Sequence, residues 1–178
     1  MTAELVESAR QLAEERLAEL PRRLAHVRGV AAAAGRIRSK FDTETGDRLA
    51  AAAWLHDIGY APSVWETGFH PLDGARFARA QGFDETVVSP VAFHTGALAE
   101  ARERGISVLS AFGVVDSDVL DALTFCDLTT GPDGYGVSAA QRLDEVLQRY
   151  GPSDPVHRAV DSCRDELLAA VERVQSWA

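Results

Sequence analysis

Apolar residues recur every three to four positions along most of the chain, with charged residues between them. This spacing places the apolar side chains on one face of an α-helix. The first such segment starts near residue 4, and its apolar positions are Leu5, Ala9, Leu12, Ala13, Leu17 and Leu20. No segment shows a convincing period of two, which is typical of β-strands. The pattern therefore predicts an all-α protein.

Glycine, proline and capping residues mark the ends of the predicted helices. Pro21 and Pro71 suit a first helical turn, and Gly59 follows the last apolar residue of another segment. Pro90 lies inside a segment, where it predicts a kink or a break. The connections, of which 95–115 is the longest, are expected to shape any pocket. The predicted helices cover about residues 4–19, 21–34, 42–58, 70–82, 84–94, 117–127, 138–150 and 154–176.

The composition is that of an ordinary soluble protein. The chain has 178 residues, of which 46% are hydrophobic and 25% are charged, and this length suffices for one sizeable core. We therefore expect a single domain over residues 1–178. The formal net charge of −9 argues against a broad nucleic-acid-binding surface, which needs clustered positive charge.

Neither a membrane span nor an export signal is expected from the sequence. No run of 18 apolar residues exists, and the first residues are acidic where a secretory signal is basic. Cys126 and Cys163 are the only cysteines, too few for a disulfide framework or a cysteine metal cage. These features predict a cytoplasmic protein.

Four of the five histidines lie in the first hundred residues, each on or at the edge of a predicted helix. His56 follows Leu49 at helical spacing, so its imidazole is expected to face the interior. His94 follows Val91 in the same way. A buried imidazole is costly unless its ring nitrogens find partners, so these positions indicate either satisfied core histidines or metal ligands. The four residues are His26, His56, His70 and His94.

Two aspartates extend this set. Asp57 is next to His56, and Asp127 ends an apolar helix, where a buried carboxylate needs a cation or several donors. Nitrogen and oxygen ligands of this kind suit Fe, Mn, Co, Ni, Zn or Mg. The predicted ligands are His26, His56, Asp57 and Asp127 for one ion, and His70 and His94, with Asp57 bridging, for a second.

The order of these residues resembles the H...HD...D signature of the HD-domain superfamily of metal-dependent phosphohydrolases. His26 is followed by Trp54-Leu55-His56-Asp57-Ile58-Gly59 and then by Asp127. The stretch His70-Pro71-Leu72-Asp73-Gly74-Ala75 and the later His94 resemble the extra ligands of dinuclear members. The resemblance covers about residues 20–135 and implies a helical core that holds the metal between helices. Residues 1–19 and 136–178 would then be helical extensions that pack on this core or form a homodimer surface.

Two features depart from the patterns of dinuclear relatives. Tyr60 stands in the region where many of them have a lysine soon after His-Asp-Ile-Gly. Gly134-Tyr135-Gly136 is similar to the Gly-Tyr-Pro element of cyclic-dinucleotide phosphodiesterases, but it lacks the proline and lies elsewhere in the chain. A cyclic dinucleotide substrate is therefore not assigned.

The resemblance implies a cytoplasmic hydrolase that cleaves a nucleotide or another small phosphate ester with a metal-activated water. One or two divalent ions would be bound, with His56 and Asp57 essential for catalysis. Arg28, just past His26, and Arg76 are the predicted phosphate contacts, and ordinary solvated surface arginines are the alternative. His157, after the proline that begins the last helix, is predicted to be exposed and outside the site.

Two other functions stay open at this point. Some HD-domain relatives use the same six-ligand pattern for a di-iron centre that activates oxygen, so a di-iron oxygenase is one alternative. A catalytically silent domain that binds a metal or a nucleotide for regulation is the other. Inactive relatives often lose a ligand, whereas all six positions are filled here.

Overall fold

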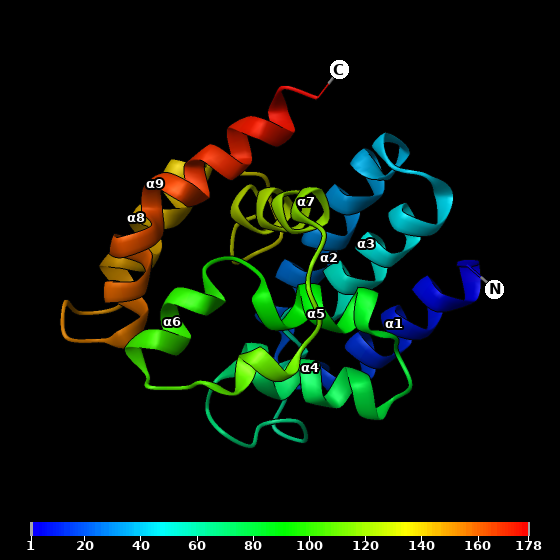
Figure 1. Ribbon diagram of the computed structural model, residues 1–178, viewed down its shortest axis with the longest axis horizontal. Helices are drawn as coiled ribbons and strands as arrows, with labels where there is room; N and C mark the ends of the chain where they lie inside the picture. Colours follow the sequence, from blue (N-terminus) through cyan, green and yellow to red (C-terminus); the bar gives the residue numbers. More distant parts are fainter. Residues whose placement is uncertain (1, 178) are drawn as a thin grey trace.

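The computed structural model describes residues 2–177, and its regular structure is helical (Figure 1). Its helices are α1 (Thr2–Arg16), α2 (Pro21–Ile37), α3 (Thr43–Leu55), α4 (His70–Ala80), α5 (Glu85–Phe93), α6 (Ala97–Glu103), α7 (Ser117–Leu128), α8 (Ala139–Arg149) and α9 (Pro155–Gln175). Short 3-10 helices cover Arg38–Lys40, Ile58–Tyr60 and Val108–Ala111. Within residues 2–177 there is no strand, and one isolated antiparallel bridge joins Thr130 to Gly136. The predicted all-α class is confirmed.

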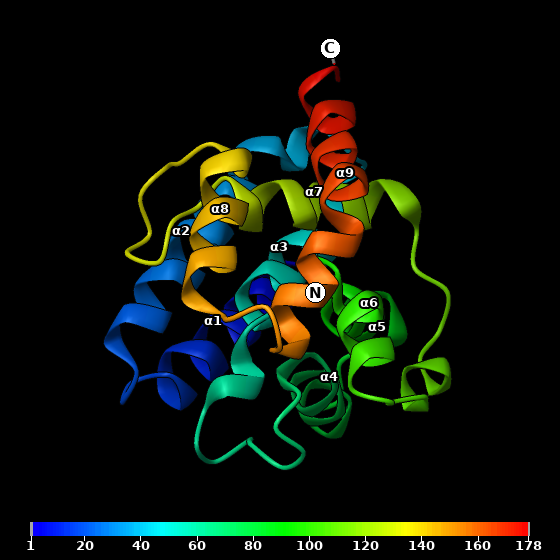
Figure 2. The same ribbon diagram turned by 90° about the vertical axis from the view of Figure 1, so that its left-hand side faces the viewer.

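Helix α3 lies at the centre, and α1, α2, α5 and α7 pack around it. Helices α8 and α9 pack against each other, and α9 also packs on α6 and α7. Figures 1 and 2 show the α8 and α9 pair on the side of the molecule away from α1. The C-terminal pair thus covers one side of the bundle.

The sequence of α3 explains its central position. Its side chains from Leu49 to Ala53 are all buried, and four of these five are alanines, so neighbouring helices can come close. The helix begins at Asp42, whose side chain accepts a hydrogen bond of 3.0 Å from the backbone N–H of Thr45. It ends at Leu55, so the next two residues leave the helix in the middle of the molecule.

Three details of the predicted helices are wrong. Helix α3 ends at Leu55 rather than at Ile58, and a 3-10 turn follows. Pro90 lies inside α5 without ending it. Helix α6 falls in the segment 95–115, which was expected to be a connection. Its seven residues are mostly strong helix formers, but they are too few for a periodic pattern to be recognised.

Both terminal helices pack on the rest of the protein. Helix α1 buries Ala9, Ala13 and Leu17 and lies against α3. His157 is half-buried rather than exposed, because its Nδ1 lies 2.8 Å from the carbonyl oxygen of Tyr150 and holds the start of α9 against the end of α8. A homodimer stays a prediction. None of the helices in the described residues combines the length and apolar character needed to cross a bilayer.

Candidate metal centre

Four histidines and two aspartates that are far apart in the chain meet in the interior. His26 lies on α2, His70 begins α4, and Asp127 lies near the end of α7. His56 and His94 directly follow the last residues of α3 and α5, and Asp57 follows His56. His70 is half-buried, and the other five are buried, with relative exposures between 0% and 9%. All six predicted ligands thus lie together, although metal binding by each stays a prediction.

The carboxylate of Asp57 lies between two sets of side chains and presents one oxygen to each. Its Oδ2 is 3.5 Å from His56 Nε2 and 3.8 Å from His26 Nε2. Its Oδ1 is 3.4 Å from His70 Nε2 and 3.8 Å from His94 Nε2, and these two nitrogens are 3.3 Å apart. We call His26, His56 and Asp127, with Oδ2 of Asp57, the first group, and His70 and His94, with Oδ1 of Asp57, the second group.

The spacing of the ligand atoms suits an ion in each group. His26, His56 and Asp57 offer atoms within 4.8 Å of one another, and so do Asp57 and the two histidines of the second group. Asp127 Oδ1 adds to the first group at 3.0 Å from His26 Nε2. Because metal–ligand bonds are about 2.0–2.2 Å long, two ligands of one ion lie up to about 4.4 Å apart.

Backbone carbonyl groups orient three of the imidazoles. The Nδ1 atoms of His26, His56 and His94 lie 3.0, 2.8 and 2.7 Å from the carbonyl oxygens of Gly131, Ala53 and Val91. A hydrogen bond donated from Nδ1 leaves the lone pair of Nε2 free to face a metal. Within the described chain, the buried His56 Nε2 has no hydrogen-bond partner. A buried polar atom without a partner is uncommon, and a metal ion would satisfy it.

Two glycines allow the close backbone contacts that assemble the site. A Cβ atom on Gly59 would lie 2.0 Å from the carbonyl oxygen of His70, so only glycine lets the turn after Asp57 contact the start of α4. Gly134 has a φ of +83°, and a Cβ there would lie 2.4 Å from the carbonyl oxygen of Ala25. The loop after α7 therefore packs directly on α2 beside His26.

The two carboxylates are held in the ionised form that metals bind. Burial by itself would raise the pKa of each group. For Asp57, the charges of His56 and Arg23 outweigh burial and keep its pKa well below the usual range. For Asp127, the hydrogen bond from His26 and the charge of His56 have the same effect on its pKa.

The imidazoles of the site differ in their affinity for protons. Burial lowers the pKa of His56 and brings that of His70 well below the usual range, because a charged ring loses its hydration in the interior. Burial also opposes protonation of His26, but the hydrogen bond and charge of Asp127 outweigh it and raise the pKa of His26. His56 and His70 are thus neutral and offer lone pairs, whereas a metal at His26 competes with a proton.

Two adjoining cavities give access to the ligands. The smaller, of about 110 Å³, is lined by five of the six ligands and by parts of α8 and α9. The larger, of about 580 Å³, lies between the start of α2, the loop after α7 and α8. A space of this size accommodates a small molecule. The residues that line both cavities are Arg23, His26, Tyr60, Arg142 and Arg149.

Comparison with known families agrees with this geometry. The family model of the HD domain matches residues 23–123, which is more than half of the chain. The chain belongs to the HD domain family. HD domains are in general metal-dependent phosphohydrolases that use divalent metals. No curated protein and no solved structure was found to match.

The matched segment of the HD domain contains five of the predicted ligands and ends shortly before Asp127. The family prediction is therefore confirmed. Whether this HD domain binds one ion or two stays a prediction, and so does its division into a core and two extensions.

Sequence reasoning missed Arg23, which contacts both a ligand and the cavities of this HD domain. Its Nη1 donates a hydrogen bond of 2.5 Å to Asp57 Oδ2. Its guanidinium lies 4.1 Å from the centre of the Tyr60 ring, which stacks on His70 at 4.1 Å. Burial and the charge of Asp57 raise the pKa of Tyr60, so its hydroxyl stays protonated. Arg23 precedes His26 by one helical turn, and this spacing is a signal that could have identified it.

Thr95 directly follows a ligand of the second group and was also missed. It has a φ of +40°, which is uncommon for a residue other than glycine. It lines the smaller cavity, and its buried hydroxyl has no hydrogen-bond partner among residues 2–177. Strained backbone of this kind is often found at functional sites. A hydroxyl group is thus available to a ligand beside His94.

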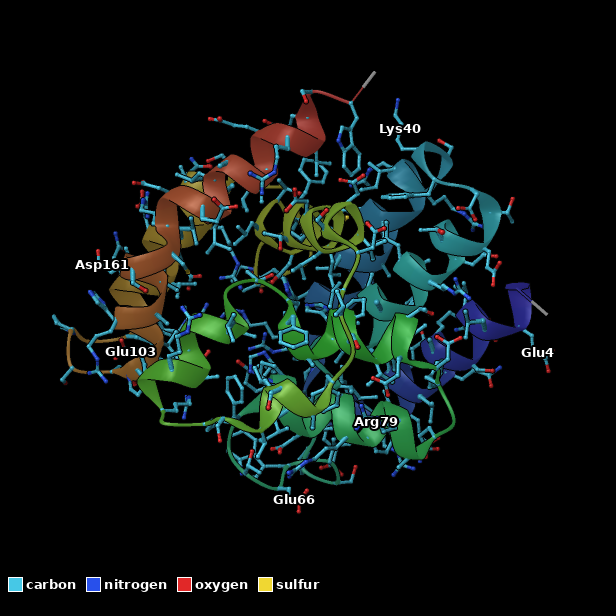
Figure 3. The ribbon with its side chains drawn as sticks, viewed as in Figure 1. Glu4, Lys40, Glu66, Arg79, Glu103 and Asp161 are labelled. Atoms are coloured by element: carbon cyan, nitrogen blue, oxygen red, sulfur yellow. The ribbon has the colours of Figure 1, made fainter. Side chains whose placement is uncertain are left out.

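The two arginines predicted to bind phosphate lie outside both cavities. Arg28 Nη2 is 3.1 Å from Glu14 Oε1, and Arg76 Nη1 is 3.7 Å from Glu66 Oε2. Figure 3 shows Glu66 at the outer edge of the molecule, directed away from the other helices. Phosphate binding by Arg28 and Arg76 stays a prediction, and the arginines that line the cavities are Arg22, Arg23, Arg142 and Arg149.

Proposed function

We propose that this HD domain is a metal-dependent phosphohydrolase that acts on a nucleotide or another small phosphate ester. The main support is the buried set of six nitrogen and oxygen ligands beside a cavity lined by four arginines. Ligands of this kind bind divalent ions, and arginines bind phosphate oxygens. The cytoplasm, where cysteines stay reduced, is the proposed location, since Cys126 and Cys163 are both free thiols.

The six ligands have distinct places in this proposal. His26, His56 and Asp127 would hold one ion, His70 and His94 a second, and Asp57 would contact both. When bound, the metal supplies a water of lowered pKa and neutralises negative charge on the phosphate. Burial among five helices keeps bulk water away from these ligands and fixes their positions before substrate arrives.

Arg23 connects the ligands to the substrate cavities. It donates a hydrogen bond to Asp57 and lines both spaces, so its remaining N–H groups can reach a phosphate over the ligands. Its pKa is raised because the charge of Asp57 outweighs the effect of burial, so the guanidinium stays charged. A charged donor in a half-buried site binds phosphate more strongly than a neutral one.

The test is phosphate release from a broad panel of phosphate esters by protein loaded in turn with Fe, Mn, Co, Ni, Zn or Mg. We expect metal-dependent release that is lost in the His56→Ala variant. Asp161→Ala serves as a control, because Asp161 is exposed on α9 and lines neither cavity (Figure 3).

Two results would contradict the proposal. Oxygen consumption by the iron-loaded protein without phosphate release would indicate the di-iron oxygenase. Tight metal retention with no turnover of any ester would indicate a regulatory domain.

A further inference from the structure

The larger cavity concentrates positive charge in a protein whose formal net charge is −9. Arg22, Arg23, Arg142 and Arg149 line it, together with part of the ligand site. Glu19 is the only acidic residue among the side chains found to line this cavity. A wall with four guanidinium groups and one carboxylate attracts anions even when the whole protein is acidic.

Helix α8 presents two of these arginines on one face. Arg142 and Arg149 are seven residues apart, which is about two helical turns. Glu145 lies between them and accepts hydrogen bonds from both guanidinium groups. Arg142 is buried, and the Arg149 side chain is 37% exposed. Glu145 thus holds the two groups as a pair at the wall of the cavity.

This amount of positive charge exceeds what a single phosphate at the ligands needs. A phosphate there would already face the metal ions and Arg23. The pair on α8 adds two forked donors, each able to form two parallel hydrogen bonds to oxygens of one anion. Leu20, Pro21 and Pro132 form an apolar part of the same wall, suited to the carbon skeleton of a substrate.

We propose that the larger cavity binds a second phosphate group of the substrate. The substrate class is a small molecule with two phosphates, one over the metal ligands and one against Arg142 and Arg149. This inference rests on the proposed function for the first phosphate. It adds that the substrate has a second phosphate, which the arginines on α8 recognise.

The test uses phosphonates, whose P–C bonds are not cleaved by phosphoester hydrolysis, so binding is measured without turnover. Alkylene bisphosphonates of increasing chain length and alkylphosphonates of matched length are titrated calorimetrically into the metal-loaded full chain. We expect at least one bisphosphonate to bind about tenfold more tightly than its matched monophosphonate, which corresponds to about 1.4 kcal/mol.

The variants Arg149→Gln and Arg142→Lys are expected to remove most of this advantage and to change monophosphonate affinity little. Arg149→Gln is the primary variant, because a half-exposed helix residue tolerates substitution better than the buried Arg142. Arg10→Gln is the control. The Arg10 side chain is 39% exposed, pairs with two glutamates on α1, and lines neither cavity.

Three results would overturn the inference. The first is that no bisphosphonate binds better than its monophosphonate. The second is that the advantage survives in Arg149→Gln and in correctly folded Arg142→Lys. The third is an equal advantage for phosphonoalkanoates, which would identify the second group as a carboxylate.

Failure of the inference and failure of the proposed function are distinguishable. Hydrolysis of simple phosphate esters without a bisphosphonate advantage would leave the function standing and remove the second phosphate. An arginine-dependent bisphosphonate advantage without hydrolysis of any ester would remove the function and leave an anion site.

Discussion

The two ligand groups of this HD domain differ in how completely the protein surrounds them. The first group offers four side chains, and His26 and His56 are almost fully buried. The second group offers three, and the His70 side chain is 14% exposed. Metal sites with four protein ligands are commonly structural, whereas sites with three keep a position for water or substrate. The comparison indicates that the first group retains its ion and the second exchanges ion and substrate.

The supports of the two groups differ in the same direction. Backbone carbonyls orient both histidines of the first group, and Asp127 adds a carboxylate. In the second group, a carbonyl orients His94, whereas His70 is positioned by stacking on Tyr60. Stacking fixes the ring less strictly than a hydrogen bond does. Conformational adjustment on substrate binding is therefore expected first at His70.

The largest effect is expected from Asp57→Ala, because this carboxylate contacts both groups. We expect both ions to be lost and phosphate release to fall by about 10³-fold or more, equivalent to about 4 kcal/mol of transition-state stabilisation. Elemental analysis and steady-state kinetics measure the two effects, with Asp161→Ala as the control. Retention of one ion per chain in Asp57→Ala would show that the groups do not share this ligand.

The variants His56→Ala and His94→Ala distinguish the two groups. If each group binds one ion, His94→Ala lowers the metal content from two ions to one, whereas His56→Ala removes the tightly held ion. We expect metal affinity at the altered group to fall by about 100-fold, since a direct ligand matters at least as much as its supporting contacts. Competition with a metal-binding dye measures it. Identical loss of metal in the two variants would contradict a difference between the groups.

Gly59→Ala tests the backbone contact that brings His70 to Asp57. The added Cβ would lie 2.0 Å from the carbonyl oxygen of His70, so α4 must move away. We expect the free energy of unfolding to fall by about 2 kcal/mol and metal to be lost from the second group first. Chemical denaturation and metal titration are the measurements.

The matched control for this substitution is Gly35→Ala on α2. Nothing lies within 4 Å of a Cβ at Gly35, so stability should stay unchanged or rise by up to about 1 kcal/mol. Equal destabilisation by the two variants would show that the close approach at Gly59 has no special role.

The helices and the ligands were largely predictable because burial imposes a period on the sequence. An imidazole that continues an apolar stripe, as His56 continues that of Leu49, must face the interior. The end of α3 was not predictable in this way, because His56 and Asp57 continue the helical spacing although the backbone leaves the helix at Leu55. The closing contact is the approach of Gly59 to α4, which only the fold reveals.

The cavity arginines could not be recognised from the sequence. Arg142 and Arg149 lie on a strongly amphipathic helix among other charged residues, where their spacing looks like that of any solvated face. Their importance depends on how α8 packs against α9 and is positioned beside the start of α2. That placement is decided by tertiary contacts. Arg23 differs, because its distance from His26 in the sequence already places both on one face of α2.

The smallest effects are expected at the two arginines that the sequence indicated. Arg28 and Arg76 form exposed ion pairs outside the cavities, and such pairs contribute little. We therefore expect Arg28→Gln and Arg76→Gln to change kcat/KM by less than about twofold. Arg23→Gln, which removes a charged donor beside Asp57, should lower kcat/KM by about tenfold.

Steady-state kinetics on the three variants, with metal content measured in parallel, decides between the surface and the cavity arginines. A loss of kcat/KM at constant metal content in Arg23→Gln assigns this residue to the substrate, whereas loss of metal assigns it to the positioning of Asp57. Arg28→Gln or Arg76→Gln as damaging as Arg23→Gln would mean that substrate reaches the ligands from a side where the structure has no cavity. In that case the open side of the second group would have to be sought elsewhere.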